Sequence, residues 1–261
     1  MATKEELKAA SLQLSSSNER DEAAMLIKYL GLKQLDEESL DNEFEYYMLQ
    51  VAISPEAKDL GIEWAFHVIN GSQYPDLLRI LVACSLGKIY RDGTSLPKDL
   101  VKAKDLFEWA CRFDYPKAME SLADFYYYGW ATPVDYSRAF SLFLKSNALS
   151  SSLVSCFRLG DMYANGKGCS QDAETAFAFY QRAFRKWKED GEDTRYKGDV
   201  ALRMGTGYMQ AKDYDKALEY FMQAIEGYTY QKEHGSTLVQ AKLDCALRLK
   251  SLIAENINPS H

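Results

Sequence analysis

The chain has 261 residues, of which 47% are hydrophobic and 26% are charged, a composition typical of folded proteins and not of disordered ones. Its formal net charge of −7 argues against general nucleic-acid binding, which requires a basic surface. No apolar run approaches the ~20 residues that span a membrane, and the first residues, MATKEELKAA, lack the basic-then-apolar order of a signal peptide. We therefore expect a cytoplasmic protein that has no membrane partner.

Residues 1–80 are the first predicted region, a set of acidic helices that is continuous with the rest of the fold. They hold 15 acidic and 7 basic side chains. The stretches KEELKAASLQL and ERDEAAMLIKYL predict two short capping helices, and the stretches on either side of Ser54 and Pro55 predict a degenerate helix pair. We interpret the acidity as a solvated helical face, and the alternative is an interaction surface for a basic partner.

Three similar segments follow within residues 81–187. They start at Leu86, Leu122 and Leu159, which are 36 and 37 residues apart. After each leucine a tyrosine, a glycine, an aspartate, an alanine and a second aromatic residue recur in the same order. The matching positions are Tyr90, Tyr126 and Tyr163; Gly93, Gly129 and Gly166; Asp99, Asp135 and Asp172; Ala103, Ala139 and Ala176; and Phe107, Phe143 and Tyr180. Similarity at this period is typical of stacked helical repeats.

Each recurring position has a physical reason that predicts an antiparallel pair of helices. The leucine and the tyrosine lie on one buried helical face, and the glycine ends that helix because it adopts the left-handed conformation easily. Pro97 and Pro133 suit the first position of the second helix, where the aspartate complements the helix dipole and Thr132 is a candidate cap. The alanine keeps the two helices close. One such pair cannot bury its apolar face alone, so neighbouring pairs must stack.

The last predicted elements are a fourth helix pair over residues 196–230 and a capping helix over residues 234–256. The fourth pair repeats the small and aromatic positions, but its Tyr208 and Ala217 are 9 residues apart, whereas the corresponding residues of the first three segments are 13 apart. The final segment, TLVQAKLDCALRLKSLIAEN, is amphipathic and is expected to cover the last repeat.

These spacings resemble two related families of helical repeats. The longer unit, LGxxYxxG followed by Asp, Ala and an aromatic residue, resembles the Sel-one-like repeat family, and the shorter fourth unit resembles the tetratricopeptide repeat. The resemblance extends from Leu81 to Tyr230. It implies an all-α fold, a right-handed alpha-alpha superhelix or solenoid of antiparallel helix pairs. It also implies a protein-interaction scaffold, without naming the partner.

The resemblance further implies that the first helix of each pair lines a concave groove that receives a partner. The corresponding positions of this chain are Lys88, Arg91, Glu120, Asp124, Tyr127, Tyr128, Phe157, Asp161 and Asn165. Carboxylates beside aromatic rings suit a peptide or protein segment that carries basic or apolar side chains. Tyr126 is expected in the core. Tyr127 and Tyr128 contact either the ligand or a neighbouring repeat, and Trp130 is expected to pack between turns.

No motif in the chain predicts catalysis, a metal or a cofactor. His67, His234 and His261 show no metal-ligand spacing, and neither GxSxG nor a glycine-rich phosphate loop is present. The five cysteines lack paired spacing, which favours reduced thiols. We therefore predict a non-enzymatic protein-interaction scaffold without a cofactor. A self-associating structural subunit is the alternative, and a hydrolase-type enzyme is the third possibility.

Overall fold

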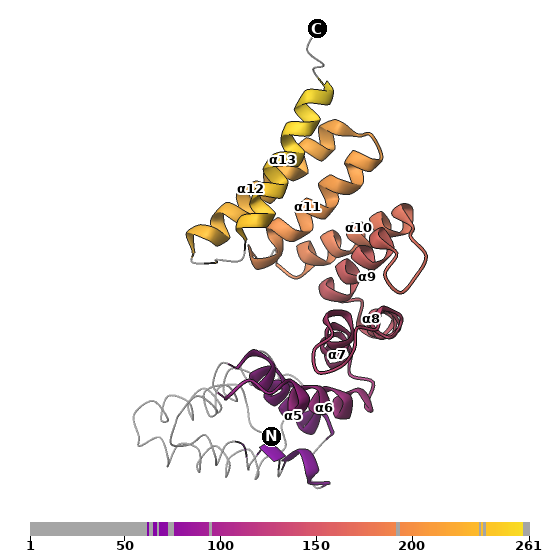
Figure 1. Ribbon diagram of the computed structural model, residues 1–261, viewed down its shortest axis with the longest axis vertical. Coiled ribbons are helices and arrows are strands. Elements are labelled where there is room, and N and C mark those ends of the chain that lie inside the picture. The colour runs from indigo at the N-terminus through magenta and orange to yellow at the C-terminus, as the bar shows by residue number, and fades with distance from the viewer. Residues whose placement is uncertain are drawn as a thin grey trace. The chain divides into compact units, whose positions relative to one another are not determined.

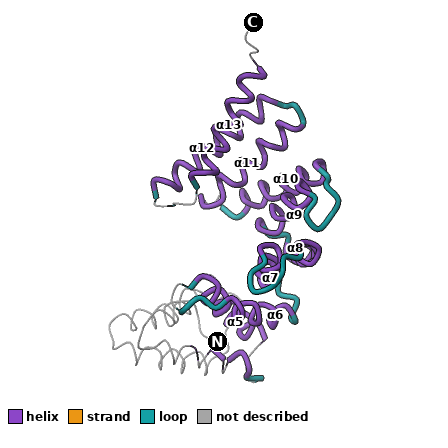
Figure 2. Tube along the Cα trace, in the orientation of Figure 1, coloured by secondary structure: helices purple, strands orange, loops and turns teal. Residues whose placement is uncertain are grey.

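The computed structural model describes residues 62, 65–66, 68–72, 76–93, 96–191, 194–234, 236 and 239–257, and within them every regular element is an α-helix (Figures 1 and 2). The helices predicted within residues 1–61, and His67, lie outside the described residues. In chain order the helices are α5 (Asp76–Asp92), α6 (Leu100–Cys111), α7 (Pro116–Tyr128), α8 (Tyr136–Ser150), α9 (Leu153–Asn165), α10 (Ala173–Glu189), α11 (Thr194–Gln210), α12 (Tyr214–Glu233) and α13 (Gln240–Ile257).

The chain divides into two compact units, Met1–Val134 and Asp135–His261, and each is described by itself. In the first unit α5 packs against α6, and α6 packs against α7. In the second unit α8 packs against α9, α9 against α10, α10 against α11, and α11 against α12, while α13 lies along α12 (Figure 1). Helices that follow one another in sequence are therefore neighbours in space within each unit, as stacked helix pairs require.

The first helix of a repeat ends at the predicted glycine. Helix α7 ends at Gly129 with φ 73°, and α9 ends at Gly166 with φ 64°, in the left-handed region that glycine enters without a steric penalty. The backbone N–H groups of Gly129 and Trp130 both donate to the carbonyl of Phe125. These bonds occupy a carbonyl oxygen that the end of the helix would otherwise leave without a partner.

The second helix of each repeat begins directly after the recurring aspartate, which is its N-cap. In each case the carboxylate accepts a hydrogen bond from a backbone N–H in the first turn, which the helix itself cannot satisfy. In three repeats the backbone N–H of this aspartate also donates to the carbonyl of the first-helix tyrosine: Asp99 to Tyr90 at 2.9 Å, Asp172 to Tyr163 at 2.9 Å and Asp213 to Tyr208 at 3.0 Å. The same bond therefore closes both the long turns and the shorter fourth turn.

The prolines before these helices do not occupy the first helical position, contrary to the sequence interpretation. Helix α6 begins at Leu100 and α8 begins at Tyr136, so Pro97 and Pro133 each lie two residues before the aspartate N-cap. Thr132 lies in the turn and does not cap α8. The reason is that the aspartate carboxylate reaches the free N–H groups of the first turn, which fixes the start of the helix at the aspartate.

Two of the three recurring tyrosines lie in the core as predicted. Tyr90 is 6% exposed and Tyr126 is 4% exposed, and the Tyr126 hydroxyl donates to the Glu108 carboxylate at 3.1 Å. Tyr163 is only partly buried, and its ring stacks on Phe179 with the ring centres 5.7 Å apart. The predicted register is therefore correct, and Tyr163 lies less deeply because it packs among other partly exposed rings.

Close approach of the two helices in a repeat depends on an aromatic ring of the second helix that lies over a glycine of the first. A Cβ atom built on each glycine would come within 3.0 Å of that ring, a distance that real Cβ atoms avoid. The predicted alanines are buried as well, so both small positions keep the helices close. The glycine–ring pairs, with these distances, are Gly87 and Phe107 (3.0 Å), Gly160 and Tyr180 (2.4 Å), and Gly205 and Phe221 (2.6 Å).

We expect Gly160→Ala to destabilise the fold by about 1–3 kcal/mol, because the added methyl group overlaps the Tyr180 ring. The better helix propensity of alanine offsets up to about 1 kcal/mol of this loss. Gly87→Ala is the matched control, since its Cβ would lie 3.0 Å from the Phe107 ring, and we expect a smaller loss. Urea unfolding compares the two variants with the wild type. Equal losses would show that ring contact does not set the helix spacing.

Candidate functional site

In the first unit, the expected groove positions lie along α5 and α7. Arg91 is in the last turn of α5, and its guanidinium donates two hydrogen bonds to the Asp92 carboxylate, at 2.7 and 2.9 Å. These bonds raise the pKa of Arg91 despite its partial burial, and the charge of Asp124 on α7 acts in the same direction. Lys88 and Glu120 are partly buried. The structure therefore brings charged side chains of both helices within electrostatic range of one another.

An aromatic cluster stands at the end of α7, in the sequence YYYGW. The turn at Gly129 brings the Trp130 ring onto Tyr128, with ring centres 4.9 Å apart and an interplanar angle of 21°. Tyr127 meets Tyr128 edge-on at 4.9 Å, and Trp130 meets the buried Phe125 edge-on at 5.5 Å. Tyr128 is 44% exposed. We call Tyr127, Tyr128 and Trp130 the α7 aromatic cluster, which is held by its own ring contacts and still presents surface to solvent.

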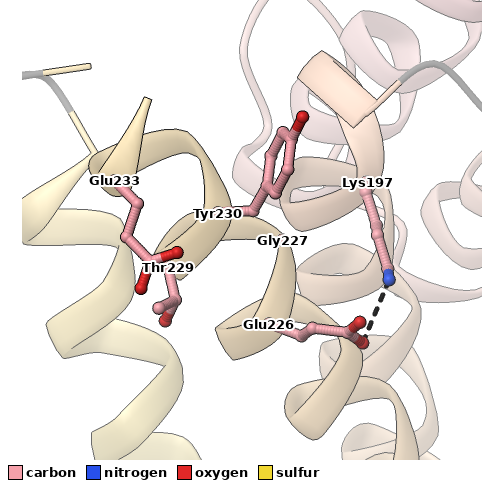
Figure 3. Close-up of a pocket in the computed structure, with 6 residues that line it drawn as sticks. All are labelled: Lys197, Glu226, Gly227, Thr229, Tyr230 and Glu233. Carbon is pink, nitrogen blue, oxygen red and sulfur yellow. Dashed lines mark ion pairs between the residues drawn. The ribbon is translucent and has the colours of Figure 1, made fainter. Parts of the chain in front are cut away.

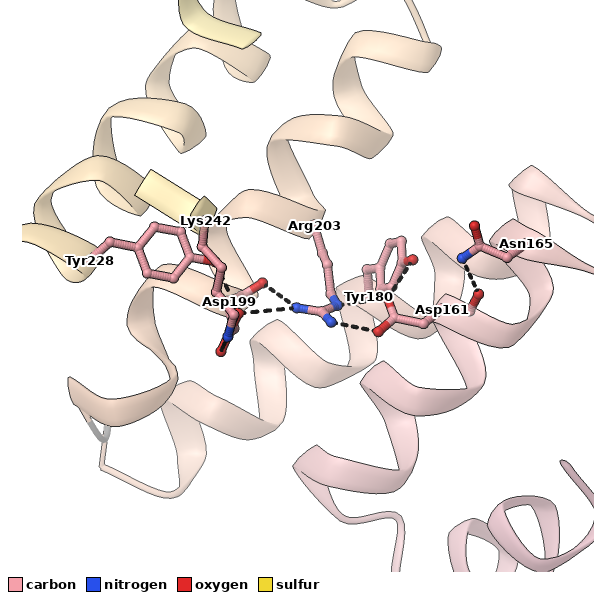
Figure 4. Close-up of polar contacts among 7 residues, drawn as sticks. All are labelled: Asp161, Asn165, Tyr180, Asp199, Arg203, Tyr228 and Lys242. Atoms are coloured by element: carbon pink, nitrogen blue, oxygen red, sulfur yellow. Dashed lines mark hydrogen bonds and ion pairs between the residues drawn. The ribbon is translucent and has the colours of Figure 1, made fainter. Parts of the chain in front are cut away.

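In the second unit, two of the three expected groove positions on α9, Phe157 and Asp161, contact Arg203 of α11, and Figure 4 shows the contact with Asp161. Nε of Arg203 donates to Oδ1 of Asp161 at 2.8 Å, and Nη2 donates to the other carboxylate oxygen. The guanidinium carbon of Arg203 lies 4.8 Å from the centre of the Phe157 ring. The Asn165 side chain donates to the backbone carbonyl of Asp161 at 2.7 Å. Phe157 and Asp161 are therefore brought together, and they hold an arginine of the same chain.

A second aspartate, Asp199 on α11, extends these contacts to α13. Its carboxylate accepts hydrogen bonds from Lys242 at 2.9 Å and from the Tyr228 hydroxyl at 2.9 Å, and Nη1 of Arg203 lies 3.6 Å from it. We call Asp161, Arg203, Asp199 and Lys242 the acid–base chain (Figure 4). Negative and positive groups alternate along it, so each charge has an opposite charge beside it.

The acid–base chain is built on a Gly-Asp dipeptide that occurs twice. In both places the glycine makes room for a tyrosine ring of the following helix, and the aspartate accepts a hydrogen bond from that tyrosine's hydroxyl, at 3.0 and 2.9 Å. The two sets are Gly160, Asp161 and Tyr180, and Gly198, Asp199 and Tyr228.

The sequence analysis did not predict three members of the acid–base chain, which are Asp199, Arg203 and Lys242. They stand outside the positions that align between repeats, so the repeat pattern does not select them. The signal that could have found Asp199 is the second Gly-Asp dipeptide, followed by a tyrosine on the next helix.

Burial and charge shift two pKa values within this network. Burial disfavours the charge of Arg203, but hydrogen bonds to Asp161 and the charges of Asp161 and Asp199 outweigh that effect and raise its pKa. Burial, followed by the charge and hydrogen bond of Asp199, raises the pKa of Tyr228 well above its usual value of 10. Arg203 therefore stays cationic and Tyr228 stays protonated around neutral pH, as suits residues that position helices.

Other chemical features can be read from the described part of the chain. No cluster of three or more His, Cys, Asp or Glu residues there could hold a metal ion. None of the helices described has the length and apolar character needed to cross a membrane. The five cysteines are free thiols in the structure; they are Cys84, Cys111, Cys156, Cys169 and Cys245.

We expect Arg203→Met to lower the free energy of unfolding by about 3 kcal/mol, because it leaves the partly buried Asp161 carboxylate without its counter-charge. The double variant Arg203→Met/Asp161→Leu should recover part of this loss, since neither charge then remains. Lys216→Met removes the exposed ion pair with Asp213 and serves as the control, with no measurable change expected. Denaturant unfolding at neutral pH would contradict the expectation if Arg203→Met and Lys216→Met unfold at the same midpoint.

We expect alkaline pH to destabilise the wild type more than Tyr228→Phe. The folded state keeps the Tyr228 proton because its pKa is raised, whereas the unfolded chain releases that proton above pH 10. The contribution of the Tyr228 ionisation to stability is therefore fully present below pH 10 and is lost as the pH rises further. At pH 11 the wild type should have lost about 1.4 kcal/mol more than the variant, relative to pH 8. Denaturant unfolding at both pH values tests this, and parallel losses in the two proteins would contradict it.

A model of the family described as Sel1 repeat matches the chain four times, at residues 82–112, 116–151, 153–186 and 198–227. Together the four matches cover half of the chain. The fourth match includes the repeat with the shorter turn, in which the aspartate nevertheless bonds to the tyrosine carbonyl. The resemblance seen in the sequence is therefore confirmed.

A solved structure gives the same result for the fold. The chain is similar to a Sel1 repeat protein from Oxalobacter formigenes, with 15% identity, a TM-score of 0.56, and coverage of 95% of this chain and 99% of that one. It also matches c5321, a protective antigen of uropathogenic Escherichia coli strains with an SLR fold, with 17% identity, a TM-score of 0.49, and coverage of 90% of this chain and 56% of that one. The first match confirms the predicted all-α superhelix of helix pairs. The chain belongs to the Sel1 repeat family, whose repeats are generally protein–protein interaction modules and typically non-catalytic scaffolds.

Proposed function

We propose that this chain is a non-enzymatic scaffold that binds a peptide or a segment of a protein partner on the first helices of its repeats. The observation that carries the proposal is the α7 aromatic cluster, whose Tyr128 is 44% exposed. Large exposed rings are the side chains that most often dominate the energy of protein interfaces. The proposed contact surface therefore centres on the end of α7.

The ring contacts within the cluster favour binding because they reduce its entropic cost. Tyr128 is fixed between Tyr127 and Trp130, each with its ring centre 4.9 Å away. A partner that docks on these rings does not have to immobilise flexible side chains first, and such preorganisation improves affinity. Glu120 and Asp124 are also on α7 and make that helix acidic, which favours a partner segment with basic and apolar side chains.

Arg203 gives an internal example of how such positions recognise a cation. Its guanidinium binds the Asp161 carboxylate with two nitrogens and lies over the Phe157 ring. Asp161 and Asp124 occupy the same position in successive repeats, after Leu-Gly and Leu-Ala respectively. A carboxylate at this position of a repeat is therefore able to hold an arginine.

We also propose that the protein acts in the cytoplasm. All five of its cysteines are thiols, and reduced thiols are typical of proteins in a reducing compartment. Fractionation of the source cell, with detection of the native protein, tests this location. Recovery with an oxidising compartment would contradict it.

We expect the double variant Tyr127→Ala/Tyr128→Ala to lose the partner, because it removes the rings that form the contact surface. Affinity capture from the source cell with quantitative mass spectrometry should show proteins retained by the wild type and depleted at least tenfold on the variant, a loss of about 1.4 kcal/mol. Tyr127→Phe/Tyr128→Phe keeps both rings and should retain most of the binding.

Val101→Ala is the matched surface control, since Val101 is 61% exposed on α6 and lies outside the proposed site. Circular dichroism must show that all variants keep the helical fold. If the alanine double variant captures the same proteins as the wild type, the α7 assignment is wrong. Light scattering at two concentrations tests the alternative of self-association, and a monomer at both would remove it.

A further inference from the structure

A hollow of about 350 Å³ opens beside the C-terminal half of α12 in the second unit (Figure 3). Its lining comes from two helices, with one residue on α11 and the others within two turns of α12. The lining residues are Lys197, Glu226, Gly227, Thr229, Tyr230 and Glu233. Three charged groups and one aromatic ring therefore surround a small open space.

Two glycines allow α11 and α12 to approach closely beside this space. A Cβ atom on Gly227 of α12 would lie 2.6 Å from the backbone nitrogen of Gly198 on α11, so the two backbones are almost in contact. Gly227 contributes no side chain to the hollow that it lines. The larger residues Glu226 and Tyr230 stand around it and form the walls (Figure 3).

The charges in the hollow are unequal. Nζ of Lys197 lies 3.0 Å from the Glu226 carboxylate, so these two side chains neutralise each other. Glu233 forms no ion pair with any residue that the structure describes, and it leaves the lining with a net negative charge. A cationic ligand would complement this charge, and an anion would be repelled by it.

The Tyr230 ring narrows the choice of cation. One face of the ring stacks on His234, with the ring centres 4.0 Å apart, and the side chain is still 46% exposed. An aromatic face beside a carboxylate suits a planar guanidinium, which stacks on the ring and forms two hydrogen bonds to the carboxylate. A divalent metal needs several oxygen ligands, whereas only Glu233 has a carboxylate that is not already held by a lysine.

The size of the hollow indicates one side chain as the occupant. Its volume lies at the low end of the roughly 300–1,000 Å³ of small-molecule sites, and the space is open to solvent. We infer that this hollow binds an arginine side chain of a protein partner, stacked on Tyr230 and paired with Glu233. This site goes beyond the proposed function on α7, and it stands whether or not the α7 aromatic cluster binds a partner.

Binding of N-acetyl-arginine amide to the full chain, followed by NMR shifts of the backbone amides, tests the site. We expect shifts at Lys197 and over residues 226–234, and weaker binding for N-acetyl-citrulline amide, which has the same shape without the charge. Glu233→Gln should weaken arginine binding about three- to fivefold, the effect of losing one exposed charge pair. Lys197→Gln should tighten it, because Glu226 is then released to the ligand.

The two variants are expected to change arginine affinity in opposite directions, which distinguishes ligand recognition from a structural effect. Glu219→Gln changes an exposed glutamate on the same helix outside the hollow, and it should leave binding unchanged. Equal binding of the citrulline compound, shifts confined to other regions, or weakening by both Glu233→Gln and Lys197→Gln would each overturn the inference. Because the readout is local to α12, these failures are distinct from a failure of the capture experiment on α7.

Discussion

The contact between a glycine on one helix and an aromatic ring on the next sets how closely the helices of a repeat approach. Phe107 and Phe221 lie over Gly87 and Gly205 and have no exposed surface. A short helix pair has little apolar area of its own, so a ring buried this completely supplies much of its stability. Any larger residue at Gly205 would displace the Phe221 ring and move α11 and α12 apart. The turns follow from this spacing, because they need only join helix ends whose separation is already fixed.

The acid–base chain is a consequence of the same close approach. Where the residue after the glycine is an aspartate, as at Asp161 and Asp199, the neighbouring ring and helix remove much of its water, and each side chain is only about a fifth exposed. A carboxylate in that position is costly unless opposite charge and hydrogen bonds compensate it. Arg203 and Lys242 supply the charge, and the tyrosine that covers the glycine supplies a hydroxyl. The polar network therefore completes the packing and does not require a catalytic explanation.

The features that could be predicted from the sequence are those fixed by neighbouring residues and repeated along the chain. The glycine at the end of α7 and the aspartate before α6 act within one turn of the helix, so their pattern is visible in the sequence. The start of α6 was misplaced because Pro97 and Asp99 are both valid start signals and only the carboxylate bond decides between them. The pairing of Arg203 with Asp161 joins residues 42 apart in sequence, so no local pattern shows it. Nor does any local pattern show that Asp161, one of the positions expected to face a groove, is held by an arginine of the same chain.

Carboxylates beside aromatic rings in this fold differ in whether the chain itself supplies a cation to pair with them. On α9, Asp161 and Phe157 receive an arginine from α11, which ties successive repeats together. On α12, Lys197 balances Glu226, but the structure describes no cation that pairs with Glu233. A contact such as that of Asp161 with Arg203 contributes to stability and not to recognition, because an external ligand would have to displace a charge-assisted pair. A ligand that pairs with Glu233 would not have to displace such a pair, so we expect recognition at carboxylates that no cation in the described part of the chain already holds.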